Sequence, residues 1–292
     1  MTNVKIWISA FRLRTLPLAT ASIAIGSFLA AAENSFQWRV AILGFLTAVL
    51  LQILSNLAND YGDTVHGADG VERRGPVRAV QTGTITRSQI KLALLIFVAL
   101  CLLVGYLLIR NENLIFHLSG LAAIAAAVAY TLGPRPYGYA GLGDLFVFLF
   151  FGVVGVFGIY YLHTHQVNWQ ILMPAAACGL FCVGVLNINN IRDIDSDKLA
   201  GKNTIPVRLG ETKAKIYHWT LLISALGITL LFILANLRSA WQFLFLLTVP
   251  LILQNAIGIS IRTEAASLDP YLKQMVITTL LFSLCFGLGL LL

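Results

Sequence analysis

Nine long apolar runs limit the folds open to this 292-residue chain more than any other feature of its sequence. A helix needs roughly 20 mostly apolar residues to cross a bilayer, because the hydrocarbon core is about 30 Å thick and each helical residue adds about 1.5 Å. Strict two-residue alternation, the pattern of a membrane β-barrel, is absent, so the sequence predicts an all-α bundle of about nine transmembrane helices. The predicted spans are Leu16–Ala32, Val40–Leu57, Leu92–Ile109, Leu114–Leu132, Leu142–Leu162, Ile171–Leu186, Ile216–Ala235, Trp241–Ile259 and Met275–Leu292.

Composition agrees with a membrane protein. Hydrophobic residues make up 58% of the chain and charged residues only 11%, whereas soluble domains carry about a quarter charged residues. This balance argues against a water-soluble enzyme and against disorder. We therefore predict one integral membrane domain over residues 1–292. The net charge of +7 is typical of cytoplasmic loops beside anionic lipid, so membrane lipid is an expected partner and nucleic acid is not.

The basic residues predict an orientation. With the N-terminus in the cytoplasm, 17 of the 20 Lys and Arg residues fall on the cytoplasmic side, and only Arg39, Arg110 and Arg238 fall outside. This asymmetry is a strong positive-inside signal. It predicts a multi-pass protein of the cell (inner or cytoplasmic) membrane. Two long cytoplasmic segments, Ala58–Lys91 and Asn189–Lys215, depart from the short connections elsewhere, and long connections tend to carry function.

These two segments also collect the acidic residues. Six of the eight aspartates lie in them: Asp60, Asp63 and Asp69 in the first, and Asp193, Asp195 and Asp197 in the second. Asparagines accompany them, and Asn59 and Asn189 stand 130 positions apart, which suggests two related halves that face each other.

Spacing places several of these groups on shared helix faces. Residues four apart lie on one face, which aligns Asn189 with Asp193 and Asp197. In the first segment Asn59 aligns with Asp63, and a competing face aligns Asn56 with Asp60, so this choice stays open. Stacked carboxylates repel one another unless a cation lies between them. Oxygen ligands without matching Cys or His favour Mg²⁺ over zinc.

Basic residues and turn residues follow each acidic motif. Mg²⁺ held by few carboxylates usually completes its shell with water and substrate phosphates, so nearby cations are candidate phosphate contacts. Arg73, Arg74 and Arg78 follow the first motif, and Lys202 follows the second. Arg78 and Lys202 stand between turn residues and are the stronger candidates for a diphosphate.

Long stretches of the chain resemble the UbiA superfamily of intramembrane aromatic prenyltransferases, and within it the branch that uses 1,4-dihydroxy-2-naphthoate. The likeness covers nearly the whole chain. It rests on motifs such as NLANDYGD and NINNIRDIDSD, in the stretches Arg14–Ala19, Leu51–Asp63, Gly75–Gly83, Tyr130–Asp144 and Leu186–Gly210. Gly67 stands where the general pattern has a third aspartate, with Asp69 two positions later, and this form resembles the naphthoate branch.

The resemblance implies a reaction: a polyprenyl diphosphate alkylates 1,4-dihydroxy-2-naphthoate, and diphosphate and CO₂ are lost to give demethylmenaquinol, in menaquinone biosynthesis. Mg²⁺ and basic side chains would stabilise charge on the leaving diphosphate. The residues expected to carry catalysis are Asp63, Asp193, Asp197, Arg78 and Lys202. The expected metal ligands are Asn59, Asp63, Asp193 and Asp197 in the first rank, and Asp60, Asp69 and Asn189 in the second.

Further substrate contacts are expected around this centre. Aromatic rings can shield an allylic cation from water; Tyr61 and Tyr130 are candidates, together with Tyr137, Tyr139 and Tyr160. The polyprenyl tail would enter sideways from the bilayer. The naphthoate carboxylate would seek a cation such as Arg135 or Arg14.

Two other functions compete with this one. A member of the same superfamily that prenylates 4-hydroxybenzoate or another acceptor would keep the metal and diphosphate residues and change only the aromatic pocket. A cation-coupled transporter would also carry intramembrane carboxylates and a weak repeat. It predicts acidic residues near mid-span, whereas here they lie at cytoplasmic helix ends.

Overall fold

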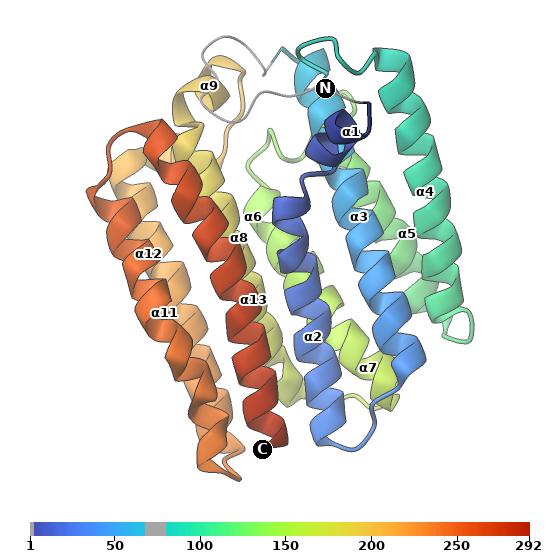
Figure 1. The fold of residues 1–292 in the computed structure, drawn as a ribbon, viewed down its shortest axis with the longest axis vertical. Coiled ribbons are helices and arrows are strands. Elements are labelled where there is room, and N and C mark those ends of the chain that lie inside the picture. Colours follow the sequence, from blue (N-terminus) through green and yellow to red (C-terminus); the bar gives the residue numbers. More distant parts are fainter. Residues whose placement is uncertain (1–2, 68–79) are drawn as a thin grey trace.

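The computed structural model describes residues 3–67 and 80–292, and every regular element in them is a helix (Figure 1). Eight helical segments of this described part are long and apolar enough to cross a membrane, and Leu114–Ala129 is a shorter apolar helix. The predicted all-α bundle is therefore confirmed. The run predicted as the fourth span forms a helix of 16 residues, below the length usually needed to span the bilayer alone.

In chain order the elements are α1 (Asn3–Phe11), η1 (Leu13–Thr15), α2 (Leu16–Ala32), α3 (Trp38–Val65), α4 (Arg87–Ile109), α5 (Leu114–Ala129), α6 (Gly143–Val147), η2 (Phe148–Gly158), α7 (Ile159–Thr164), η3 (Trp169–Ile171), α8 (Leu172–Arg192), α9 (Ile194–Leu199), α10 (Ile205–Leu209), α11 (Glu211–Ala235), η4 (Ala240–Thr248), α12 (Val249–Ile261), η5 (Ala265–Leu268) and α13 (Asp269–Leu291).

Side-chain caps stand at the starts of helices α4 and α5. Thr86 and Gln89 form a reciprocal capping box at the start of α4, and the Asn113 side chain accepts a hydrogen bond from the Ile115 backbone N–H at the start of α5. These bonds satisfy backbone donors that the first helical turn leaves unpaired. These two helices therefore begin with part of their first-turn backbone donors satisfied by side chains.

Helix α8 lies at the centre of the bundle and α4 at its edge. In the most apolar stretch of Trp169–Arg192, 72% of the residues are buried, against 11% in the corresponding stretch of Arg87–Ile109. The main core packs around α8 and includes Phe181, Phe245 and Phe282. A second cluster joins α1, α3 and α4. The two acidic motifs lie at the ends of α3 and α8, which belong to different clusters.

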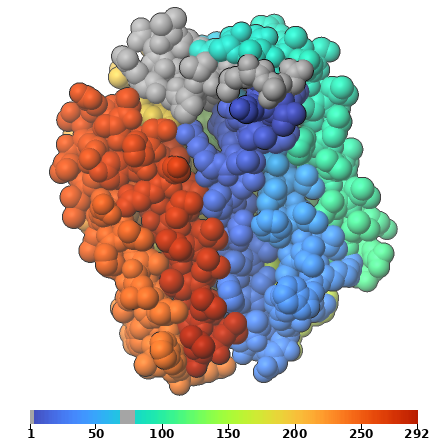
Figure 2. Space-filling view, in the orientation of Figure 1, coloured from blue at the N-terminus to red at the C-terminus, as the bar shows by residue number. Residues whose placement is uncertain are grey.

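Packing also brings the first long helix and the last helix together, although the two chain termini lie at opposite ends of the bundle (Figure 1). Helix α13 lies beside α2 on the face shown in Figure 2, so the last helix of the chain contacts the first long one. The C-terminal end of α3, helix α9 and helix α1 all lie at the same end of the bundle (Figure 1). That end contains the predicted site.

Candidate active site

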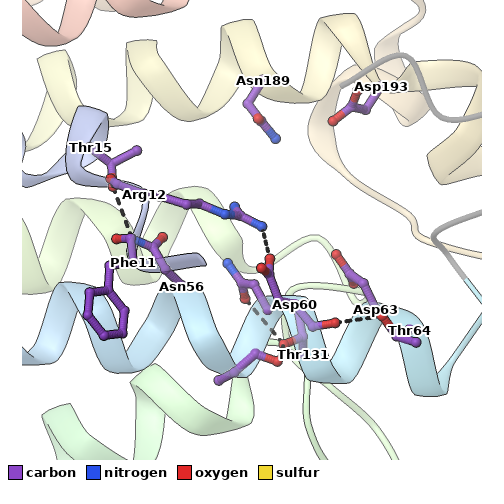
Figure 3. A network of polar contacts seen from close by, with 12 residues as sticks. Phe11, Arg12, Thr15, Asn56, Asp60, Asp63, Thr64, Thr131, Asn189 and Asp193 are labelled. Atoms are coloured by element: carbon purple, nitrogen blue, oxygen red, sulfur yellow. Dashed lines mark hydrogen bonds and ion pairs between the residues drawn. The ribbon is translucent and has the colours of Figure 1, made fainter. Parts of the chain in front are cut away.

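The two acidic motifs face each other at one end of the bundle. Asp60 and Asp63 project from the last turns of α3 toward Asn189 and Asp193, which come from the end of α8 (Figure 3). All four motif aspartates that the structure describes on these faces, including Asp197 of α9, are buried. Buried carboxylates require partners, and the partners here are basic side chains, some close in the chain, such as Arg192 beside Asp193, and some distant, such as Arg12 beside Asp60.

The Asn56 and Asp60 face of α3 contacts the N-terminal segment. The Arg12 guanidinium forms an ion pair with Asp60 (Figure 3). The Asn56 side-chain amide donates to the Phe11 carbonyl oxygen at 3.0 Å and to the Thr15 hydroxyl at 3.1 Å. This face therefore anchors the N-terminal segment and presents one carboxylate, Asp60, beside Arg12.

The Asn59 and Asp63 face contacts the segment between α5 and α6. The Thr131 hydroxyl donates to the Asn59 side-chain oxygen at 3.2 Å. The Tyr139 hydroxyl donates to Asp63 Oδ1 at 2.9 Å, and Lys202 Nζ lies 3.0 Å from the same oxygen. Asp63 thus faces the second half of the molecule.

Lys202 connects the two motifs. Its Nζ lies 3.0 Å from Asp63 Oδ1 and 3.5 Å from Asp197 Oδ1, and it stands 4.9 Å from the centre of the Tyr139 ring. The backbone is held from both sides: Lys202 N donates to the Asp197 carbonyl at 2.8 Å, and Asn203 N donates to the Tyr139 carbonyl at 2.8 Å. The lysine is therefore placed by main-chain bonds as well as by charge.

Arg192 organises the second motif. Its guanidinium binds both carboxylate oxygens of Asp193, at 2.9 and 2.6 Å. It also donates to the Asn189 side-chain oxygen at 2.8 Å and to Asp269 Oδ1 at 2.8 Å. A planar guanidinium suits such forked contacts. One buried arginine thus fixes two predicted metal ligands.

The electrostatics of the site agree with a cation-binding role. Burial raises the pKa of Asp197 to about 6; Lys202 opposes this shift, and the negative charges of Asp193 and Asp63 add to it. The negative charges of Asp193 and Asp63 therefore stand close enough to Asp197 for a cation between them to be stabilising.

The donor set fits Mg²⁺, although the carboxylates are held by protein cations. Within residues 3–67 and 80–292 no three His, Cys, Asp or Glu side chains converge as a ready metal shell. Arg12, Lys202 and Arg192 pair with the carboxylates there. The candidate donors are carboxylate and amide oxygens, which Mg²⁺ prefers. Diphosphate oxygens would give these basic side chains another partner and release the carboxylates for metal.

The structure separates some predicted residues from this centre. Tyr61 packs against the cluster of α1, α3 and α4, with Lys91 Nζ 5.8 Å from its ring centre, so its ring is not brought to the carboxylates. Tyr130 follows α5, and its ring lies 5.3 Å from that of Tyr137 and packs against Gly143 at the start of α6. Arg135 is exposed in the segment after α5. Four predicted residues lie outside the described residues: Asp69, Arg73, Arg74 and Arg78.

Sequence reasoning missed or under-ranked several groups. Arg12 and Asp269 carry no local signal, because their partners lie 48 and 77 positions away. Arg192 directly precedes Asp193, so its position in the motif could have identified it. Tyr139 was considered only as an aromatic shield, whereas its hydroxyl binds Asp63.

Close packing of Gly62 against Thr131 gives a test of this geometry. A Cβ added to Gly62 would lie 2.6 Å from the Thr131 carbonyl oxygen, so we expect Gly62→Ala to push α3 away and to lower stability by about 1–3 kcal/mol. Gly227→Ala is the matched control, since nothing lies within 4 Å of its Cβ position. Thermal unfolding in detergent should show a lower midpoint for Gly62→Ala alone; equal midpoints would contradict the packing.

Comparison with known proteins identifies the family. The family model described as the UbiA prenyltransferase family matches residues 19–277. A 1,4-dihydroxy-2-naphthoate octaprenyltransferase of Escherichia coli is 45% identical over 295 aligned residues, covering 99% of this chain and 96% of that protein. The protein of the same name from Haemophilus influenzae is 46% identical, with the same two coverages.

Solved structures agree on the fold. A UbiA homologue from Archaeoglobus fulgidus, solved with DMAPP and Mg²⁺, has a TM-score of 0.71 at 18% identity and covers 98% of both chains. A UbiA homologue from Aeropyrum pernix, solved in the apo state, has a TM-score of 0.70 at 20% identity, again with 98% of both chains covered. At these identities the likeness establishes the shared helical architecture.

Proposed function

Because this chain belongs to the UbiA prenyltransferase family, we propose that it transfers a polyprenyl group from polyprenyl diphosphate to 1,4-dihydroxy-2-naphthoate. The reaction releases diphosphate and CO₂ and yields demethylmenaquinol. The observation that carries the proposal is the pair of buried acidic motifs that face each other across Lys202. The naphthoate acceptor is supported by relatives of that name at 45 and 46% identity over 99% of the chain.

The proposed roles follow from the geometry. Asn59 and Asp63 from the first motif and Asn189, Asp193 and Asp197 from the second would hold Mg²⁺. Mg²⁺, when bound, supplies positive charge to the diphosphate oxygens. Asp60 is a further candidate, in contact with Arg12.

Basic side chains would bind the leaving group. Lys202 stands between the motifs, and its ammonium can move from the carboxylates to a diphosphate oxygen without leaving the site. As the allylic carbon–oxygen bond breaks, its electron pair stays on the diphosphate, and nearby positive groups would stabilise that charge. Arg73, Arg74 and Arg78 remain proposed diphosphate contacts from the sequence alone.

The remaining proposals concern the organic part of the substrates. Tyr130 remains a candidate aromatic shield, with its ring 5.3 Å from that of Tyr137, and Tyr139 contacts Asp63 directly. Arg135 remains a candidate for the naphthoate carboxylate. The polyprenyl tail is as apolar as lipid and would reach the site from the bilayer. The protein is a multi-pass membrane protein; we place it in the cell inner membrane with the site on the cytoplasmic side, as the distribution of Lys and Arg favours.

A product assay tests the proposal. Purified protein in detergent would be supplied with a polyprenyl diphosphate and either 1,4-dihydroxy-2-naphthoate or 4-hydroxybenzoate, with and without Mg²⁺. We expect Mg²⁺-dependent demethylmenaquinol with release of CO₂. Product from 4-hydroxybenzoate alone would change the acceptor and keep the site. No product from either acceptor would overturn the proposal and revive the transporter hypothesis.

A further inference from the structure

An ion-pair chain connects the last helix to the second acidic motif. Asp269 is the first residue of α13. Its Oδ1 accepts a hydrogen bond from Arg192 at 2.8 Å, and its Oδ2 accepts one from Arg14 at 3.1 Å. Arg192 in turn binds Asp193 and Asn189. A residue 77 positions away from Arg192 therefore reaches two predicted metal ligands through a single guanidinium.

The Arg192 guanidinium is buried, so the charges of its partners determine how its own charge is compensated. The Arg192 side chain is 1% exposed, and that of Asp269 is 36% exposed. A buried cation must be compensated by nearby negative charge. Arg192 divides its contacts between Asp193 and Asp269, and Asp269 is shared with Arg14, so Asp193 supplies only part of the negative charge that compensates Arg192. Asp193 then keeps negative charge for another cation.

The position of Asp269 is fixed by packing. Pro270 follows it in the first turn of α13, and Leu268, Leu272 and Met275 on either side are buried in the main core. A carboxylate in the first turn of a helix is also favoured by the helix dipole. Asp269 therefore offers a rigid anchor, whereas Asp193 lies at the junction of α8 and α9.

We propose that Asp269 is a positioning residue for the metal site. It binds the Arg192 guanidinium, and Arg192 in turn orients Asn189 toward the first motif. Because Arg192 is shared with Asp269, the Asp193 carboxylate keeps more of its negative charge available for Mg²⁺. The inference rests on the proposed function. Asp269 touches neither substrate nor metal in this scheme and acts through Arg192.

Asp269→Asn tests the charge while keeping the shape of the side chain. Without the Asp269 charge, Arg192 should pair more fully with Asp193, and Asp193 should bind metal less well. Residues that orient metal ligands typically change metal affinity by about 10- to 100-fold. We therefore expect about tenfold weaker binding of Mn²⁺, used as a paramagnetic probe in place of Mg²⁺, in the presence of the non-hydrolysable methylenediphosphonate.

The measurement is a Mn²⁺ titration of the purified full chain followed by electron paramagnetic resonance. Glu264→Gln is the matched control, because it removes one negative charge from an exposed residue of the same connection and should bind Mn²⁺ like the wild type. Asp269→Glu should restore much of the affinity. Equal affinity in Asp269→Asn and Glu264→Gln, with the wild type binding Mn²⁺ normally, would overturn the inference.

A double-mutant cycle tests whether Asp269 affects Mn²⁺ binding through Arg192. If Asp269 acts through Arg192, Asp269→Asn should weaken Mn²⁺ binding little further in an Arg192→Lys background. Additive effects would overturn the route, and so would a loss of thermal stability in Asp269→Asn without a change in Mn²⁺ affinity. The wild type separates the two proposals: absence of Mg²⁺-dependent product from it counts against the proposed function, whereas a wild-type Mn²⁺ affinity in Asp269→Asn counts against this inference alone.

Discussion

Asp63→Asn is expected to reduce prenyl transfer by about 10³-fold, because it removes the charge of a proposed metal ligand at the centre of the site. The folded structure should persist. An asparagine oxygen can still accept the Tyr139 hydrogen bond, and Lys202 keeps Asp197 as its anionic partner. The measurement is the rate of demethylmenaquinol formation at saturating prenyl diphosphate over a range of Mg²⁺ concentrations.

Asp195→Asn is the control for this loss. It is the same substitution in the second acidic motif, but the Asp195 side chain is exposed. Asp195 also lies on neither of the predicted helix faces that carry the metal ligands. We expect near wild-type rates from Asp195→Asn, and thermal unfolding midpoints for both variants close to that of the wild type. Substantial activity in Asp63→Asn would contradict the proposal that Asp63 is a metal ligand.

Lys202→Gln is expected to lower kcat/KM for the prenyl diphosphate by about 10²-fold, because a fixed cation that faces developing charge contributes on this scale. Both constants should change: KM should rise because a diphosphate contact is lost, and kcat should fall because the leaving group is less stabilised. Steady-state kinetics at several Mg²⁺ concentrations measure the two effects separately.

The Mg²⁺ dependence distinguishes two roles of Lys202. If Lys202 only neutralises Asp63 and Asp197, then Mg²⁺ can replace its charge, and high Mg²⁺ should restore the full rate. If it binds diphosphate, high Mg²⁺ should leave the defect in place, and this is the expected result. Lys198→Gln serves as the control, since Lys198 is an exposed lysine on the neighbouring helix α9.

Much of the architecture could be predicted because lipid imposes a simple rule. Every backbone polar group in the bilayer must be satisfied within the chain, so long apolar runs become helices. The run predicted over Leu114–Leu132 ends as a helix at Ala129, and Thr131 and Tyr139 in the following connection contact Asn59 and Asp63. Both side chains lie beyond the end of the helix, in the connection to α6.

The sequence by itself determined the helical class, the two acidic motifs and Lys202, because hydropathy and four-residue spacing are local properties of a helix. Only the tertiary structure decided which face of α3 meets which partner: Asn56 and Asp60 contact the N-terminal segment, whereas Asn59 and Asp63 contact Thr131, Tyr139 and Lys202.

The tertiary structure alone also placed Asp269 against Arg192. Helical periodicity relates residues within one helix and is silent about which helix ends meet. That pairing depends on how α13 packs beside α2 and α8 around the buried core, where side-chain volumes and the need to compensate a buried cation select one arrangement.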